Sequence, residues 1–285
     1  MGENPVLSDP DALKVRKTLA GLDFLAVSDL FLTETAGFAD VVFPAASFAE
    51  KIGTVTNSER RVQLMHQAIE PIGSCRTDAE IIVEISRHMS YEMDYENTAE
   101  IMEDIALVTP IYGGIYHDRL ENQWGLQWPC TDRAHPGTIY LHKYSFTRGR
   151  GYFALVEDRC PAESPDEDYP FLLMTGRIYH HYHTGTMTRR CEMLERESPD
   201  PFIDMHPDDA RSLQVRTGDL VRISSRRGAV EMKARVVDQV GMKTLYAPFH
   251  FHEAPINKVT TSSMDPEAKI PEYKICAVRV EKVMA

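Results

Sequence analysis

The 285-residue sequence has few cysteines, and no two of them form a short metal-binding motif. Because all five are isolated and none belongs to a C-x-x-C, we expect no structural zinc or iron–sulfur site made by this chain alone. Their odd number and irregular spacing favour a reducing compartment, so the sequence predicts a cytoplasmic protein. The five are Cys75, Cys130, Cys160, Cys191 and Cys276.

Long apolar runs and a surplus of basic residues are also absent. No apolar run approaches the ~20 residues that span a bilayer, and the polar start MGENPVLSDPD is unlike a signal peptide. The formal net charge is -12, whereas nucleic-acid binding needs a basic surface. We therefore predict no membrane span and no nucleic-acid partner.

Short apolar runs alternate with helical patterns in the first half of the sequence. Residues 24–27 read as a short buried strand, 41–44 as the next strand, and 51–57 as a loop or short hairpin. Asp9 is a plausible N-cap for a first helix, and Asp78 caps a later one whose apolar residues recur with a 3.6-residue period. This alternation predicts an α/β fold with a parallel sheet, in which ligands bind beyond the carboxyl ends of the strands.

The second half is richer in β-strand patterns. A strand is expected at 152–156, and the acidic, proline-bearing stretch 160–168 is the best linker candidate. Several short strands with turns between them follow and predict a barrel, with the clearest hairpin turn at 226–228. We therefore expect an α/β domain over 1–160 and a β-barrel domain over 168–285.

The densest polar cluster lies directly after the strand pattern at 171–174. Gly176 permits close backbone approach to a ligand, and Arg177 offers a planar fork for a phosphate. Several histidines, threonines and arginines follow within residues 180–190, which suits an extended, anionic ligand with many hydrogen-bonding groups. His181 and His183 could also bind zinc, but a metal site would need further convergent ligands, so no metal ligand is predicted in this chain.

These motifs carry a close resemblance to a known family. They are GENPVLSD at 2–9, the TGR-to-MTRR block at 175–190, HPDDA at 206–210 with TGD at 217–219, and PEYKICAVRV at 271–280. The chain resembles the C-terminal part of the molybdopterin oxidoreductases, the dimethyl-sulfoxide-reductase family. The segment GLQWPC at 125–130 looks like the catalytic, or alpha, subunit of formate dehydrogenases in particular.

The resemblance implies a fold, a cofactor and partners. The fold would be the end of a Rossmann-like α/β domain with a partial parallel sheet, followed by a double-psi β-barrel. The cofactor would be bis(molybdopterin guanine dinucleotide) with molybdenum or tungsten, used for reversible oxidation of formate to CO2. In the family, the N-terminal half carries the 4Fe-4S cluster and the selenocysteine or cysteine ligand of the metal, so this chain would need that half, together with electron-transfer subunits.

Alternative functions stay open from the sequence. The chain resembles periplasmic nitrate reductases in the TGR-to-MTRR block, and a non-catalytic cofactor-binding subunit would use the same residues. The sequence does not say whether Met1 is a natural start. No catalytic residue is predicted in these 285 residues.

The resemblance also implies sixteen cofactor-binding residues. Residues of the first-nucleotide set also have a plain structural alternative: an Asx turn for Asn4, helix capping for Asp29 and Asp78, and a solvated side chain for Lys51. Asp78 would accept from guanine N1–H and N2–H₂, which distinguishes guanine from adenine. The first-nucleotide set is Asn4, Ser8, Ser28, Asp29, Lys51 and Asp78; the second set is Thr175, Gly176, Arg177, His181, Tyr182, His183, Thr184, Phe249, Asn257 and Lys274.

The polar cluster also contains the pair Arg189-Arg190 and the residue Ile178. The pair Arg189-Arg190 would attract anions near a formate channel, or would support the backbone and a phosphate. Some formate dehydrogenases have a glutamate shortly after the strand-ending threonine, where this chain has Ile178, so no role is transferred to position 178.

Overall fold

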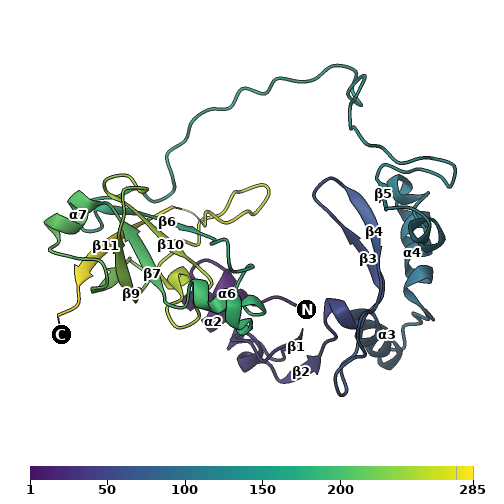
Figure 1. Ribbon diagram of the computed structural model, residues 1–285, viewed down its shortest axis with the longest axis horizontal. Coiled ribbons are helices and arrows are strands. Elements are labelled where there is room, and N and C mark those ends of the chain that lie inside the picture. Colours follow the sequence, from purple (N-terminus) through teal and green to yellow (C-terminus); the bar gives the residue numbers. More distant parts are fainter. Residues whose placement is uncertain (274, 285) are drawn as a thin grey trace. The chain divides into compact units, whose positions relative to one another are not determined.

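The computed structural model describes residues 1–273 and 275–284 (Figure 1). The chain divides into two compact units. One, here called the barrel unit, comprises Gly2–Val42 and Glu157–Ala285; the other, here called the hairpin unit, comprises Phe43–Val156 together with Met1.

Six strands of the barrel unit close into a barrel in the order β10-β6-β11-β8-β9-β7. Strand β6 runs parallel to β10 and β7 runs parallel to β9, whereas the other neighbours are antiparallel. The barrel expected from the sequence is therefore confirmed. Its strands are β6 (Phe171–Gly176), β7 (Phe202–Met205), β8 (Leu220–Ser224), β9 (Ala229–Val236), β10 (Thr244–Pro248) and β11 (Cys276–Lys282).

Alternating side chains fill the interior of the barrel. Along β9 every second residue is buried, as the two-residue period of a strand requires. Leu173, Ile203, Ile223 and Leu245 come from four different strands, are 0% exposed and belong to one apolar cluster. Burial of such a side chain contributes about 1.5–3 kcal/mol, so this cluster fixes the scaffold on which the polar loops lie.

Short helices and two strands make up the rest of the barrel unit, and the second strand, β2, crosses the boundary to the hairpin unit between Val42 and Phe43. Asp9 is not an N-cap, contrary to the prediction: the first helix is α1 (Pro5–Ser8), and α2 (Ala12–Leu19) begins after Asp11, whose φ is 51°. Strands β1 (Ala26–Asp29) and β2 (Val41–Pro44) form a sheet of two strands. A larger Rossmann-like sheet stays a prediction. The other elements are η1 (Ala36–Phe38), η4 (Thr188–Arg190), α6 (Glu192–Glu197), α7 (Pro207–Ser212) and η5 (Ile256–Lys258).

The acidic stretch predicted as a linker is held by the β8–β9 hairpin. Glu163 accepts hydrogen bonds from both Arg226 and Arg227 at 2.6 Å, and Asp166 pairs with Arg226. Arg227 also donates to the carbonyl of Val259 at 2.9 Å. These contacts attach residues 163–166 to the barrel.

The hairpin unit is built around an antiparallel sheet. Strands β3 (Gly53–Thr56), β4 (Arg61–Met65) and β5 (Leu126–Gln127) pair in that order, so residues 51–57 do lead into a hairpin. Its helices are α3 (Asp78–His88), α4 (Thr98–Val108) and α5 (His117–Glu121), with 3-10 turns η2 (Phe48–Glu50) and η3 (Pro110–Tyr112). Among the described residues, no helix combines the length and apolar character needed to cross a membrane.

Two local predictions in the hairpin unit are wrong. The N-cap of α3 is Thr77, not Asp78: Thr77 Oγ1 accepts from Glu80 N, and the Glu80 carboxylate accepts from Thr77 N at 2.7 Å. The strand expected at 152–156 is absent, and Phe153 and Leu155 are 97% and 94% exposed. A strand needs a hydrogen-bonded neighbour, and none of the described residues pairs with this segment, which follows β5 and precedes β6 along the chain (Figure 1).

Candidate functional site

A cavity of about 440 Å³ in the barrel unit, here called the barrel cavity, gathers three distant segments. The segments are residues 3–9 around α1, residues 175–183 after β6, and residues 249–273 after β10. The lining residues are Glu3, Ser8, Asp9, Thr175, Gly176, Arg177, His183, Phe249, Asn257 and Tyr273.

The parallel pairing of β6 and β10 explains why two of these segments meet. Gly176 lies opposite Pro248 in the register, so the segments that follow β6 and β10 leave the barrel at the same edge. Phe249 N then donates to Gly176 O at 3.2 Å, and the Arg177 guanidinium lies 5.9 Å from the centre of the Phe249 ring. The His183 ring meets the Phe249 ring edge-on at 5.6 Å. Carboxyl ends of neighbouring parallel strands are the usual place for a ligand.

The backbone around Gly176 is fixed by tyrosine contacts. Tyr246 donates its hydroxyl to the carbonyl of Arg177 at 2.6 Å. A Cβ at Gly176 would lie 2.6 Å from the Tyr246 ring, so only glycine allows this close packing. Thr175 donates to the carbonyl of Tyr273 at 2.7 Å, which attaches the 271–273 segment to the end of β6.

The charges in the barrel cavity are mixed. Arg177 is exposed and forms no ion pair with any residue that the structure describes, while Glu3 and Asp9 supply carboxylates. Burial, together with Asp9 and Glu3, raises the pKa of Tyr273, so its hydroxyl stays protonated. The cavity therefore offers a cationic fork, acceptors and an aromatic wall, which suits a ligand with both phosphate oxygens and N–H donors.

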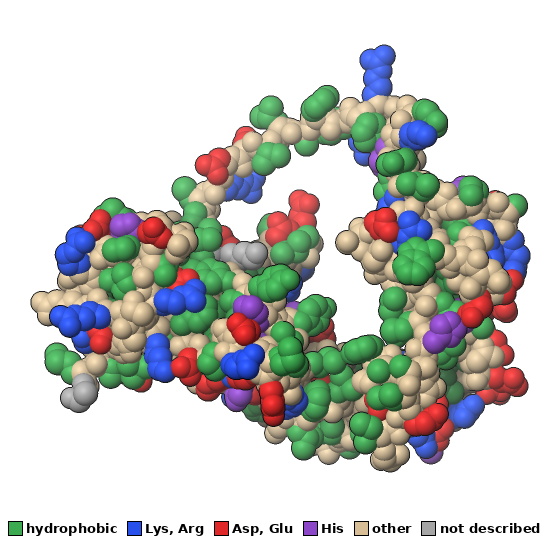
Figure 2. Space-filling view, viewed as in Figure 1, with side chains coloured by type: hydrophobic (Ala, Val, Ile, Leu, Met, Phe, Trp, Pro, Cys, Tyr) green, Lys and Arg blue, Asp and Glu red, His purple; other side chains and the backbone are tan. Residues whose placement is uncertain are grey.

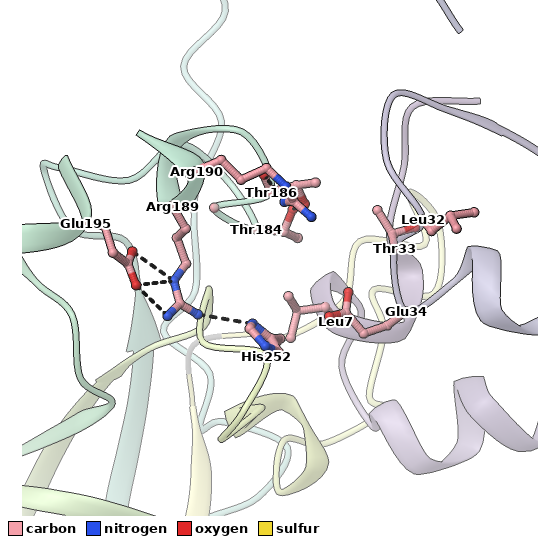
Figure 3. Close-up of a pocket in the computed structure, with 11 residues that line it drawn as sticks. Leu7, Leu32, Thr33, Glu34, Thr184, Thr186, Arg189, Arg190, Glu195 and His252 are labelled. Atoms are coloured by element: carbon pink, nitrogen blue, oxygen red, sulfur yellow. Dashed lines mark hydrogen bonds and ion pairs between the residues drawn. The ribbon is translucent and has the colours of Figure 1, made fainter. Parts of the chain in front are cut away.

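A second hollow of about 470 Å³ lies beside Thr184 and the Arg189-Arg190 pair (Figure 3). Arg189 is bound by two carboxylates, Glu195 at 2.8 Å and Glu253 at 2.7 Å, and these hydrogen bonds raise its pKa. Arg190 instead donates to the carbonyl of Thr186, and its guanidinium carbon lies 4.0 Å from the centre of the Phe31 ring. Backbone support, one of the two roles left open for the pair, therefore describes Arg190, whereas Arg189 is held by two carboxylates. Attraction of anions near a formate channel stays a prediction.

Two buried histidines lie beneath these arginines. The rings of His181 and His250 are 4.7 Å apart. His181 Nε2 lies 3.5 Å from Glu195 Oε2, and His250 Nε2 forms no hydrogen bond with a described residue. His181 Nδ1 is 3.2 Å from Thr188 Oγ1. Burial lowers the pKa of both rings, that of His250 to about 3, so both are neutral at pH 7.

We expect the barrel unit to lose stability as the pH falls from 6.5. His250 has a folded pKa of about 3, lowered from 6.5, so below pH 6.5 the unfolded chain binds a proton that the folded chain does not. Stability should fall by about 1 kcal/mol per pH unit between pH 6.5 and 5. Hydrogen exchange of the barrel amides at several pH values measures this slope. The variant His250→Gln should flatten it, and an unchanged slope in that variant would refute the assignment to His250.

The two parts of the chain match two family models. Residues 1–88 match the family described as molybdopterin oxidoreductase, and residues 171–277 match the molydopterin dinucleotide binding domain. The second match covers most of the closed barrel and both chain segments that flank β6 and β10 in the barrel cavity.

The chain belongs to the molybdopterin oxidoreductases.

Similar proteins include alpha subunits of formate dehydrogenases. The chain is 50% identical to the F420-dependent formate dehydrogenase subunit alpha of Methanocaldococcus jannaschii, and the match covers 99% of this chain and 42% of that protein. It is 34% identical to formate dehydrogenase H of Escherichia coli, over 99% of this chain and 40% of that protein. The chain thus spans less than half of the length of these relatives.

A solved structure shows the same fold at low sequence identity. Acetylene hydratase from Pelobacter acetylenicus superposes with a TM-score of 0.73, covering 99% of this chain and 44% of that chain, at 17% identity. This similarity supports the mixed α/β and barrel architecture alone. The dinucleotide-binding family match supports a molybdopterin cofactor.

Seven of the residues predicted to bind the cofactor lie together in the barrel cavity. They are Ser8, Thr175, Gly176, Arg177, His183, Phe249 and Asn257. Asn257 donates to the carbonyls of Leu7 and Ser8 at 2.9 Å, so its amide also fixes the cavity wall. Predicted Lys274 lies outside the described residues, next to the lining residue Tyr273.

Other predicted residues of the barrel unit lie apart from this cavity. Thr184 lines the second hollow, Tyr182 is 80% exposed, and His181 is buried. Asn4 donates to Glu34 at 2.6 Å and accepts from the hydroxyl of Thr35 at 2.7 Å.

The strand-end residues Ser28 and Asp29 are both buried at β1. Asp29 Oδ1 accepts from Leu30 N at 2.7 Å. The capping alternative for Asp29 is therefore wrong: the next helical turn, η1, begins at Ala36 with Thr35 as its N-cap, and Asp29 makes a local turn contact instead.

The two predicted residues of the hairpin unit contact each other. Lys51 Nζ lies 3.0 Å from Asp78 Oδ2, and their side chains are 29% and 39% exposed. A solvent-accessible pair of this kind contributes about 0–1 kcal/mol to stability, so this ion pair adds little to the fold of the hairpin unit.

Three residues that line the barrel cavity were not predicted from the sequence as cofactor-binding residues. Glu3 and Asp9 lie next to the predicted Asn4 and Ser8, and Tyr273 precedes Lys274. Adjacency to predicted residues was the available signal. Among the residues that the structure describes, no group of three or more His, Cys, Asp or Glu side chains could hold a metal ion.

Proposed function

We propose that this chain is the C-terminal half of a formate dehydrogenase catalytic subunit that binds bis(molybdopterin guanine dinucleotide) with molybdenum or tungsten. The assembled enzyme would oxidise formate to CO2 reversibly, and this half alone would be inactive. The observation that carries the proposal is the barrel cavity, which brings together seven residues expected to bind the cofactor. The 50% identity to an F420-dependent formate dehydrogenase alpha subunit supports the choice of reaction.

The donor set of the barrel cavity fits a pterin dinucleotide. Arg177 would bind a pyrophosphate oxygen through its planar fork, and His183 would donate to a phosphate or pterin oxygen. Glu3 and Asp9 would accept from N–H groups, and Phe249 would provide a wall for a flat heterocycle. When bound, the metal of this cofactor would accept the electrons of formate; this chain's residues bind and orient the group.

The proposal extends to the organisation of the subunit. We propose that the chain divides into domains at 1–160 and 168–285. The first domain would be Rossmann-like, and the second would have the crossed strands of a double-psi barrel. An N-terminal half would bring the 4Fe-4S cluster and the selenocysteine or cysteine ligand, and further subunits would carry electrons away. We place the enzyme in the cytoplasm.

Activity of the assembled enzyme tests this function. The complete subunit, purified with its partners, should reduce an artificial acceptor with formate and should not reduce nitrate. The 285-residue chain alone should do neither. Nitrate reduction without formate oxidation would contradict the proposal, as would turnover by the isolated chain.

Substitution of Asp78 by asparagine tests the nucleotide assignment in the hairpin unit. Because Thr77 is the N-cap of α3, Asp78→Asn should leave the helix intact. Loss of one carboxylate oxygen should weaken the guanine dinucleotide relative to a cytosine dinucleotide by about tenfold, equivalent to ~1.4 kcal/mol. Cofactor content of the subunit reconstituted with either dinucleotide measures the preference. Thr77→Ala is the control, which should destabilise α3 without changing the preference.

A further inference from the structure

An apolar hollow in the hairpin unit is unrelated to the cavities described above. We call it the α3 groove; it has a volume of about 480 Å³ and lies between the end of β2 and helix α3. Its lining residues are Phe43, Pro44, Ser74, Arg76, Ile81, Glu84, Ile85, His88 and Met89. Polar groups of Arg76, Glu84 and His88 accompany an otherwise apolar surface.

The apolar side of the groove is a ridge along one face of α3. Ile81 and Ile85 lie four residues apart on the same face of α3, and Met89, the C-cap of this helix, follows four residues later. Their exposure rises along the helix, from 5% at Ile81 to 39% at Ile85 and 75% at Met89. Ile82, beside the ridge, is 44% exposed.

Apolar residues that recur on one face of a helix are typical of a face packed against a protein core. The 3.6-residue period of α3 predicts that these residues contact a core, yet within the described residues only the first of the three is covered. An open ridge on a helix suits a packed helix or strand better than a small molecule, which is usually enclosed.

We propose that the α3 groove is the docking surface for the part of the same subunit that lies outside these 285 residues. The relatives with 50% and 34% identity carry a similar sequence within chains more than twice as long, so in those proteins the same polypeptide supplies a large further surface. The sheet formed by β1 and β2 points the same way, because two strands of four residues are marginal without further strands. The inference rests on the subunit organisation given under Proposed function.

Photo-crosslinking from position 89 identifies what covers the ridge. The complete subunit is prepared with p-benzoylphenylalanine in place of Met89, irradiated and digested, and the linked peptides are read by mass spectrometry. Linked peptides from outside the 285 residues are the expected result. Links to peptides from within them, from a second copy or from the same chain, would overturn the proposal.

A chemical accessibility measurement gives an independent result. Met89→Cys should react with a maleimide at least tenfold more slowly than Leu107→Cys in the folded complete subunit, with Cys75, Cys160 and Cys191 replaced by serine. Leu107 is a matched control, since it is an apolar residue near the end of α4 and is 78% exposed in this chain. Equal rates at the two positions would overturn the proposal.

The outcome is separable from that of the proposed function. Crosslinking and maleimide reaction report contacts and need neither cofactor nor turnover. A subunit that gives the expected links but no formate oxidation would refute the enzyme assignment and leave the docking surface standing. Formate oxidation with a freely reactive Met89→Cys would do the reverse.

Discussion

Replacement of Arg177 by alanine is expected to lower the affinity of the subunit for its dinucleotide cofactor by about 100-fold. Arg177 is exposed in the barrel cavity and forms no ion pair within the described part of the chain, so its guanidinium is available to a phosphate. Loss of charge-assisted hydrogen bonds worth ~3 kcal/mol in total corresponds to that factor. Cofactor content after reconstitution over a range of concentrations measures the change.

Two further variants make the result specific. Arg177→Lys keeps the charge and loses the planar fork, so its affinity should lie between those of the wild type and the alanine variant. Arg216→Ala removes an exposed arginine from the 215–219 turn of the same unit and should have no effect. Equal losses in the Arg177 and Arg216 variants would show that general charge, rather than the cavity, holds the cofactor.

Leu245→Ala should destabilise the barrel by about 3 kcal/mol, within the usual range for Leu→Ala in a core. Leu245 is 0% exposed, and its strand β10 pairs with both β6 and β7, opposite Leu173 and Met205. Removal of its side chain leaves a cavity between these strands. The two tryptophans, Trp124 and Trp128, lie in the hairpin unit and do not report on the barrel.

Hydrogen exchange of the β6 and β9 amides is therefore the measurement for Leu245→Ala. Protection factors should fall by about 100-fold, the equivalent of ~3 kcal/mol. Leu220→Ala is the control, since Leu220 is 42% exposed at the start of β8, and its protection factors should change by less than threefold. Similar losses at both positions would contradict the description of the core.

The alternation of apolar and polar residues made the barrel strands predictable. The strand predicted at 152–156 does not form because it has no neighbouring strand in the part of the chain that the structure describes. Residues 229–236 alternate between buried and exposed as the sequence implies, because each strand has a partner on both sides. Residues 152–156 are a continuous apolar run with two aromatic residues, which favours a strand, yet they form none because no described strand lies against them. Strand propensity depends on context more than helix propensity does.

The N-caps predicted from local sequence lie one or two residues from the N-caps in the structure. Thr77 and Asp78 are both good N-caps, and the capping box with Glu80 selects Thr77. Asp9 precedes Pro10, which favours a helix start there, but the helix begins only at Ala12.

The candidate site was predictable where strand order fixes it. The carboxyl ends of β6 and β10 lie together because the strands are parallel neighbours, so Arg177 and Phe249 meet as expected. Partners that depend on long-range packing were not predictable from sequence. Arg189 is paired with Glu253, 64 residues away, and this contact distinguishes it from Arg190.

The most direct test of the central claim is mass analysis of the cofactor in the intact, purified complex. The account predicts a pterin guanine dinucleotide in the wild type and a loss of most of it in the Arg177→Ala variant, with the barrel still folded. A complex that is intact and contains no pterin guanine dinucleotide would contradict the account.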